Sequence, residues 1–179
     1  KQAAKKKIPF TKDEINLLWE KVDEIKYADF TLILLYTGMR IGELLDITKE
    51  NIHLDQRYMI GGKKTAAGKN RVIPIHNRIV PLIQKCMEQS NNEWLFLNKR
   101  GGKLQYSPFM NYHWPNLMEC IKAQHTPHDT RHTFISEMDR LGVNTILTKR
   151  IVGHANETVT QHYTHKTIEE LIQAVDKLD

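Results

Sequence analysis

Five residues in this chain have the side chains needed to attack a phosphodiester and to hold the charge that develops on it. Guanidinium groups bind phosphate oxygens through paired hydrogen bonds, imidazole exchanges protons near neutral pH, and a tyrosine hydroxyl can act as a nucleophile. Such a set would need neither a metal ion nor a nucleotide. The five are Arg40, His128, Arg131, His154 and Tyr163.

Arg40 stands at the junction of two expected helices. The first helix ends at Gly38, and the second begins directly after Arg40. An arginine beside the free backbone N–H groups of a helix start favours an oxyanion. Glu43 lies three residues on, on the same helical face, and could hold an arginine in place. The alternative is an ordinary surface pair of Arg40 and Glu43.

His128 and Arg131 are spaced to share one face of the first turn of a helix. Asp129 or Thr130 can cap that helix. If Arg131 converges with Arg40, the two guanidinium groups could clamp both non-bridging oxygens of one phosphate. The alternative is a helix start that merely carries polar residues.

The elements that position these residues form an α+β fold, mostly α-helical with a small three-stranded antiparallel sheet. Apolar periodicity and a capping box at Thr11 predict the first helix. Short strands are expected at Asn51–Asp55, Arg57–Ile60 and Arg71–Ile75. Later helices are expected at Asn77–Gln89, Ser107–Ala123 (with a kink or break at Pro115), Thr130–Arg140, Asn144–Val152, Thr158–Tyr163 and Thr167–Leu178.

Composition agrees with a globular domain that prefers phosphate-rich partners. The chain has 179 residues, 40% of them hydrophobic, and a formal net charge of +5. Cys86 and Cys120 are expected to be reduced core residues of a cytosolic protein. No apolar run approaches the roughly 20 residues of a membrane span. The nine histidines show no zinc-type spacing, so no metal or other cofactor is expected.

The motifs together resemble the catalytic domain of the tyrosine recombinase (phage integrase) family. Arg40 lies in a Thr-Gly-x-Arg-x-Gly-Glu frame, His128 and Arg131 form His-x-x-Arg, and Gly-His at His154 precedes Tyr163 by nine residues. The resemblance runs from about Phe10 to Tyr163, nearly the whole chain.

This resemblance implies two successive transesterifications. Tyr163 would attack the scissile phosphate, form a 3′-phosphotyrosyl link and release a 5′-hydroxyl. Arg40 and Arg131 would stabilise the transition state. His154 would donate a hydrogen bond to a phosphate oxygen, and His128 would accept the proton of the tyrosine.

The family also uses a lysine of a β-hairpin as general acid, and the resemblance selects Lys64 because it precedes Thr65. Lys63 remains the alternative, since neighbouring strand residues face opposite sides of a sheet. The charges that are left, Lys63, Lys69 and Arg71, would then contact the DNA backbone or face solvent. His132 also matches the family and is expected to be structural.

Residues 1–9 are interpreted as a basic linker from a missing N-terminal core-binding domain, and residues 10–166 as the catalytic domain. Residues 167–179 form an amphipathic tail. The tail could cover its own core or pack on a neighbouring protomer, and the resemblance favours the neighbour.

The sequence thus predicts a site-specific DNA recombinase of a mobile element, represented here by its catalytic-domain fragment. Its expected partners are double-stranded DNA, three further copies in a tetramer on DNA, and accessory DNA-bending or directionality proteins. We expect it in the bacterial cytoplasm, with the nucleoid. The alternatives are a type IB topoisomerase-like nicking-closing enzyme and a catalytically inactive DNA-binding module.

Overall fold

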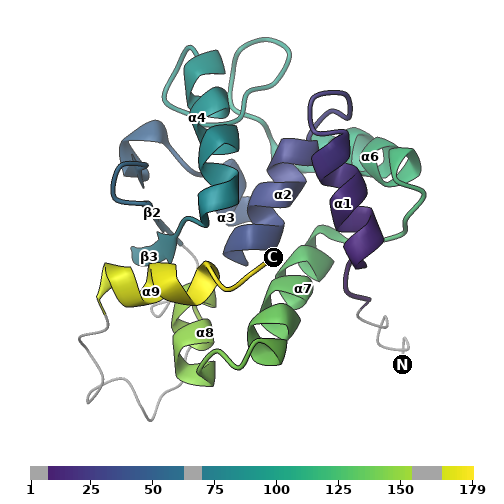
Figure 1. Ribbon diagram of the computed structural model, residues 1–179. Helices are drawn as coiled ribbons and strands as arrows, with labels where there is room; N and C mark the ends of the chain where they lie inside the picture. Colours follow the sequence, from purple (N-terminus) through teal and green to yellow (C-terminus); the bar gives the residue numbers. More distant parts are fainter. Residues whose placement is uncertain (1–7, 63–69, 155–166) are drawn as a thin grey trace, which may run out of the picture.

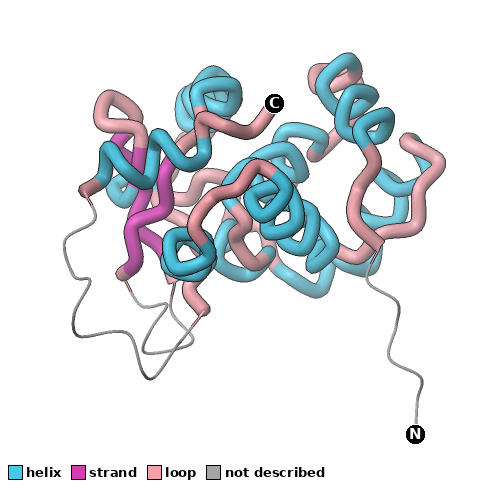
Figure 2. Tube along the Cα trace, turned by 60° about the horizontal axis from the view of Figure 1, so that its bottom comes forward, coloured by secondary structure: helices cyan, strands magenta, loops and turns pink. Residues whose placement is uncertain are grey.

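A computed structural model describes residues 8–62, 70–154 and 167–179 of the chain. The molecule is mostly helical, and a small sheet lies at one side of it (Figures 1 and 2). The first half contains α1 (Lys12–Glu20), α2 (Ala28–Thr37), α3 (Ile41–Leu45), β1 (Ile52–His53), β2 (Tyr58–Gly61), β3 (Arg71–Pro74) and α4 (Val80–Gln89), with 3-10 turns at Lys49–Asn51 and Asn77–Ile79. The second half contains α5 (Tyr106–Pro108), a π-helical turn at Phe109–His113, α6 (Trp114–Cys120), α7 (Pro127–Arg140), α8 (Thr145–Val152) and α9 (Ile168–Val175). In the described part of the chain, no helix is long and apolar enough to cross a membrane.

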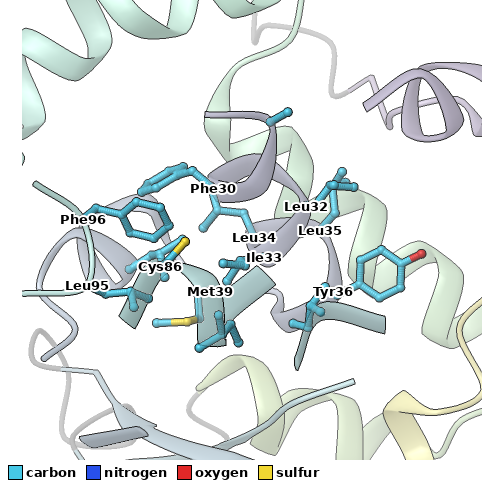
Figure 3. Packing of buried hydrophobic residues seen from close by; sticks show 14 of the residues in the cluster. Phe30, Leu32, Ile33, Leu34, Leu35, Tyr36, Met39, Cys86, Leu95 and Phe96 are labelled. Carbon is cyan, nitrogen blue, oxygen red and sulfur yellow. The ribbon is translucent and has the colours of Figure 1, made fainter. Parts of the chain in front are cut away.

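Helix α2 is the centre of the larger of two hydrophobic clusters. It is apolar on every side and packs against α1, α4 and α7, which places it in the middle of the molecule (Figure 1). Figure 3 shows how its side chains meet Phe96, Leu95 and Cys86 from distant parts of the chain. We call this group the larger cluster; its members include Phe30, Leu34, Met39, Leu44, Met59, Ile73, Ile83 and Phe109.

A second hydrophobic group, the smaller cluster, joins α7, α8 and α9. Helix α9 lies beside β3 in both overall views and contacts it (Figures 1 and 2). Its Leu171 and Val175 are buried, and Asp176 just after the helix pairs with Arg57. In this single chain the tail packs on its own core, the first of the two interpretations, and docking on a neighbouring protomer stays a prediction. The members of the cluster are Phe134, Met138, Val143, Ile151, Val152, Leu171, Ala174 and Val175.

Several local predictions are confirmed. Thr11 caps α1, with the reciprocal bonds from Thr11 N to Glu14 Oε2 at 2.7 Å and from Glu14 N to Thr11 Oγ1 at 3.2 Å. The sheet is antiparallel in the order β1-β2-β3, with Met59 opposite both Ile52 and Ile73. The α+β class is confirmed as well.

Other boundaries differ from the predictions for identifiable reasons. Helix α7 begins at Pro127, because Thr126 rather than Asp129 or Thr130 is its N-cap residue. The N–H and Oγ1 of Thr126 both donate to Asp129 Oδ2, at 2.7 and 2.8 Å. The break before Pro115 is a π-helical turn, since proline has no N–H to continue the α-helical ladder.

Two further predictions concern cysteines and an additional helix. Cys86 is buried, as expected, but Cys120 is exposed at the end of α6, so the prediction that both are core residues is wrong for Cys120. The helix predicted over Thr158–Tyr163 lies outside the described residues.

Candidate active site

Gly38 brings the end of α2 against α7 and α8 and so places Arg40. The glycine caps α2 with φ +63°, in the left-handed region that favours glycine. A Cβ atom there would lie 2.5 Å from Phe134 Cδ1 and 3.0 Å from Val152 Cγ1. Only a residue without a side chain allows this approach. The chain then reaches Arg40 at the N-cap position of α3, next to the start of α7.

Arg131 is held in the interior and has an unused donor. Its side chain is buried on α7, and Nη1 donates to the carbonyl oxygen of Gly38 at 2.7 Å. Nη2 is also buried and has no hydrogen-bond partner among the described residues. Burial, together with the nearby charge of Arg40, lowers the pKa of Arg131 to about 10. A buried cationic donor that lacks a partner within the described residues is suited to bind an anionic acceptor.

Glu43 is the carboxylate of the site, and it binds two arginines. Its Oε2 accepts the N–H of Arg40 at 2.8 Å, and its Oε1 accepts Nη1 of Arg40 at 3.3 Å. Arg71 donates Nη1 and Nη2 to the same two oxygens, each at 2.8 Å. Glu43 does hold an arginine, as the sequence suggested, but the pair is not the surface pair of the alternative interpretation because only 10% of the Glu43 side chain is exposed.

Arg71 differs from its prediction. The sequence placed it among the charges that contact DNA or face solvent, whereas its side chain is 5% exposed and faces Glu43. Its Nε donates to the carbonyl oxygen of Ile151 at 2.9 Å. A guanidinium group that is buried in this way does not lie on the surface that DNA would contact.

His128 lies in the first turn of α7 and is exposed. Its ring meets that of His132 edge to face, with 4.5 Å between centroids. Partial burial lowers the pKa of His128, and the nearby His132, Arg131 and Arg40 lower it further. The imidazole is therefore neutral at pH 7 and able to accept a proton.

His154 follows the glycine that ends α8. Gly153 has φ +69°, and the N–H of His154 turns back to the carbonyl oxygen of Lys149 at 2.9 Å. Partial burial lowers the pKa of His154, and Arg131 and Arg40 add to this effect. The second histidine thus responds to the same two arginines as His128.

Four of the six predicted catalytic side chains therefore gather at one place. Arg40 and Arg131 are close enough to lower the pKa of both His128 and His154. Arg40 and His128 also line a groove of about 890 Å³ that continues along β2 and residues 103–110. The other two catalytic candidates, Lys64 and Tyr163, lie outside the described residues, as do Lys63 and Lys69.

Metal ligands do not gather in the part of the chain that the structure describes: it contains no group of three or more His, Cys, Asp or Glu residues arranged to hold an ion. The gathered side chains are arginines and imidazoles, which suit a phosphate with a negative charge rather than a cation.

A family model described as the phage integrase family matches residues 9–170. The chain belongs to the phage integrase family. Among curated relatives, the tyrosine recombinase XerA of Pyrococcus horikoshii is 31% identical over 175 residues, which is 93% of this chain and 60% of the relative. Tyrosine recombinase XerD of Staphylococcus aureus is 30% identical over 177 residues, covering 89% of this chain and 59% of the relative. The chain thus spans about three fifths of these curated relatives.

Solved structures share the fold. The integrase of mycobacterium phage Brujita has a TM-score of 0.76 at 20% identity, and the match covers all of this chain and 60% of that one. The curated relatives carry the name of tyrosine recombinases, and the solved structure carries that of an integrase.

Proposed function

We propose that this chain is the catalytic domain of a site-specific recombinase that cleaves and rejoins DNA through a covalent 3′-phosphotyrosyl intermediate. The observation that carries the proposal is the buried Nη2 of Arg131, which lacks a partner within the described residues and lies near Arg40 and two histidines of lowered pKa. A scissile phosphate would supply the missing acceptor. Its non-bridging oxygens match two guanidinium donors in shape and charge.

Each residue then has one step in the reaction. The Tyr163 oxygen attacks phosphorus while the bond from phosphorus to the 5′-oxygen breaks. His128 accepts the proton of the phenol, a role that suits its lowered pKa. Lys64 gives a proton to the departing 5′-oxygen, and His154 donates a hydrogen bond to a non-bridging oxygen. In the second step, a 5′-hydroxyl attacks the phosphotyrosyl bond and restores Tyr163.

Arg40 and Arg131 stabilise the five-coordinate phosphorus in the transition state of each step. Fixed charges aimed at the developing negative charge are often the largest catalytic contribution. Because the covalent link conserves the energy of the broken phosphodiester bond, rejoining requires no nucleotide cofactor.

The partner is double-stranded DNA. The Tn1549 transposon integrase, solved in complex with circular intermediate DNA, has a TM-score of 0.73 to this chain at 24% identity over 93% of this chain and 64% of that one. The groove beside Arg40 and His128 gives the DNA backbone a place next to the reacting atoms. Lys63 and Lys69 contribute backbone contacts from the segment between β2 and β3.

The full-length protein acts as a tetramer on DNA in the bacterial cytoplasm, where the nucleoid lies. Residues 1–9 connect the catalytic domain to an N-terminal domain that binds the duplex together with it. Accessory DNA-bending or directionality proteins set the outcome of recombination. A duplex held by one domain alone would be bound weakly, since affinity depends on the number of phosphate contacts.

The deciding experiment uses the full-length parent protein and a nicked suicide duplex that carries its recombination site. Wild-type protein should form a covalent adduct, visible as a slower band on a denaturing gel, and Tyr163→Phe should form none. Tyr112→Phe is the matched control, because Tyr112 is exposed and does not line the groove. An adduct that survives Tyr163→Phe would overturn the assignment of the nucleophile.

A further inference from the structure

We propose that Arg71 is a positioning residue that joins the Arg40 half of the active site to the His154 half. The inference rests on the proposed function. It assigns to a buried arginine of the sheet a part in the reaction that requires no contact with DNA.

Arg71 connects three elements through one guanidinium group. From the start of β3, its Nη1 and Nη2 form a paired contact with both oxygens of Glu43 on α3, at 2.8 Å each. Its Nε donates to the carbonyl oxygen of Ile151 on α8, at 2.9 Å. The planar fork of arginine makes these three bonds at once, which the single ammonium group of lysine cannot do.

The contact with Glu43 sets how strongly that carboxylate holds Arg40. Although burial alone would raise the pKa of Glu43, the hydrogen bonds and charge of Arg71, with a smaller contribution from Arg40, together outweigh it and keep the pKa low. The bond from Arg40 Nη1 to Glu43 is longer, at 3.3 Å, and 35% of the Arg40 side chain stays exposed. Arg71 is thus the main partner of the carboxylate, and Arg40 remains available for a phosphate.

The Cδ, Nε and Cζ atoms of Arg71 pack against the turn at Gly153, the residue before His154. A Cβ atom on Gly153 would be 3.1 Å from Arg71 Cδ, 3.2 Å from Nε and 3.3 Å from Cζ. The guanidinium group therefore packs directly against the backbone of the residue before His154. A shift of this turn relative to α3 would move His154 and Arg40 apart.

Loss of Arg71 has a specific electrostatic consequence. Glu43 would keep its charge in a buried place and would have Arg40 as its remaining arginine partner among the described residues. Arg40 would then be held by the carboxylate instead of the phosphate. Neutralising Glu43 in the same variant should release Arg40 again.

The test measures single-turnover cleavage of the suicide duplex by the full-length protein, with protein in excess. We expect Arg71→Ala to slow cleavage ~10–100-fold, as small displacements of catalytic groups do, while duplex affinity stays within about threefold because Arg71 touches no phosphate. The double variant Arg71→Ala, Glu43→Gln should cleave several-fold faster than Arg71→Ala. Arg71→Lys, which restores one bond to Glu43 but not the fork, should fall between wild type and Arg71→Ala.

Arg78→Ala is the matched control. Arg78 is an exposed arginine with defined contacts: it donates to the Tyr36 hydroxyl at 3.0 Å and lies over the Trp19 ring, outside the site. Its loss should leave the cleavage rate of folded protein unchanged. Cleavage by Arg71→Lys at the wild-type rate, or a double variant no faster than Arg71→Ala, would overturn the inference. Wild-type protein that forms no adduct would instead overturn the proposed function, so the two failures are distinguishable.

Discussion

The two hydrophobic clusters differ in what they carry to the active site. The larger cluster surrounds α2 and carries Arg40, which directly follows Met39 of this cluster. The smaller cluster joins α7, α8 and α9 and carries His154 at the end of α8. Arg131 spans the two, since it lies on α7 and bonds to the carbonyl oxygen of Gly38. The site therefore lies between two cores, and its geometry depends on how they fit together.

The largest effect expected from this comparison concerns the cores themselves. Leu34 in α2 and Leu171 in α9 are both buried, at 0% and 1% exposed. Replacing either leucine with alanine should reduce the packing free energy of its cluster by about 2–5 kcal/mol. For Leu34→Ala we expect the global free energy of unfolding to fall by this full amount, because α2 is the centre of the larger cluster.

Leu171→Ala should instead act mainly on α9. Amide hydrogen exchange in α9 should quicken strongly, with a smaller change in the urea midpoint than Leu34→Ala causes, because a terminal helix can detach by local opening. Equal midpoint shifts with uniform exchange would show that the two clusters unfold as one unit.

The contact between the clusters is the next place to test. Gly38→Ala adds a Cβ at 2.5 Å from Phe134 in a left-handed conformation, so the strain of the backbone and the overpacking together should cost about 2–4 kcal/mol in urea unfolding. Gly142→Ala is the matched control: Gly142 has φ +68° but nothing within 4 Å of its added Cβ. That change should cost only the backbone strain, about 1 kcal/mol. Similar losses for both would show that the close approach at Gly38 is unimportant.

The smallest effect concerns the histidines that face both arginines. Because the pKa of His128 and His154 is lowered in the folded state, the unfolded chain binds more protons. Their contribution to stability is full above about pH 6.5 and is lost as the pH falls through their folded pKa. A bound anion should reverse the shift.

Proton NMR titration with and without sulfate measures the pKa of each histidine and how much a bound anion changes it. Sulfate between the arginines should raise the pKa of both site histidines by about one unit. His113 is the control, since burial together with Lys26 and Lys99 lowers its pKa outside the site. An identical response of all three histidines would argue against a specific anion position between Arg40 and Arg131.

Much of the local structure follows from short patterns in the sequence. The capping box of Thr11 and Glu14, the helix end at Gly38 and the three strands each depend on neighbours within a few residues. The start of α7 also has a local signal, which points to Thr126 rather than to Asp129 or Thr130. Thr126 is followed by proline and then by Asp129 at the third helical position, which is a capping pattern with aspartate in place of the usual glutamate.

The missed features depend on contacts between distant residues. Arg71 looked like a surface charge because nothing near it in the sequence reveals Glu43, which lies 28 positions away. The docking of α9 on its own chain likewise follows from the partners that cover its apolar face, and amphipathic spacing cannot identify them. Residue types and spacing predicted the chemistry of the site, whereas its supports required the folded chain.

The bond between Arg131 and Gly38 has a consequence for genetic studies. Its acceptor is a main-chain carbonyl, so no substitution at Gly38 removes it, and Gly38→Ala would report only steric strain, whereas Arg131→Ala removes the whole arginine together with the bond. Replacing the peptide bond after Gly38 with an ester would leave the carbonyl in place but weaken it as an acceptor. Backbone chemistry of that kind, rather than mutagenesis, is the way to measure how much this anchor contributes to orienting the arginine.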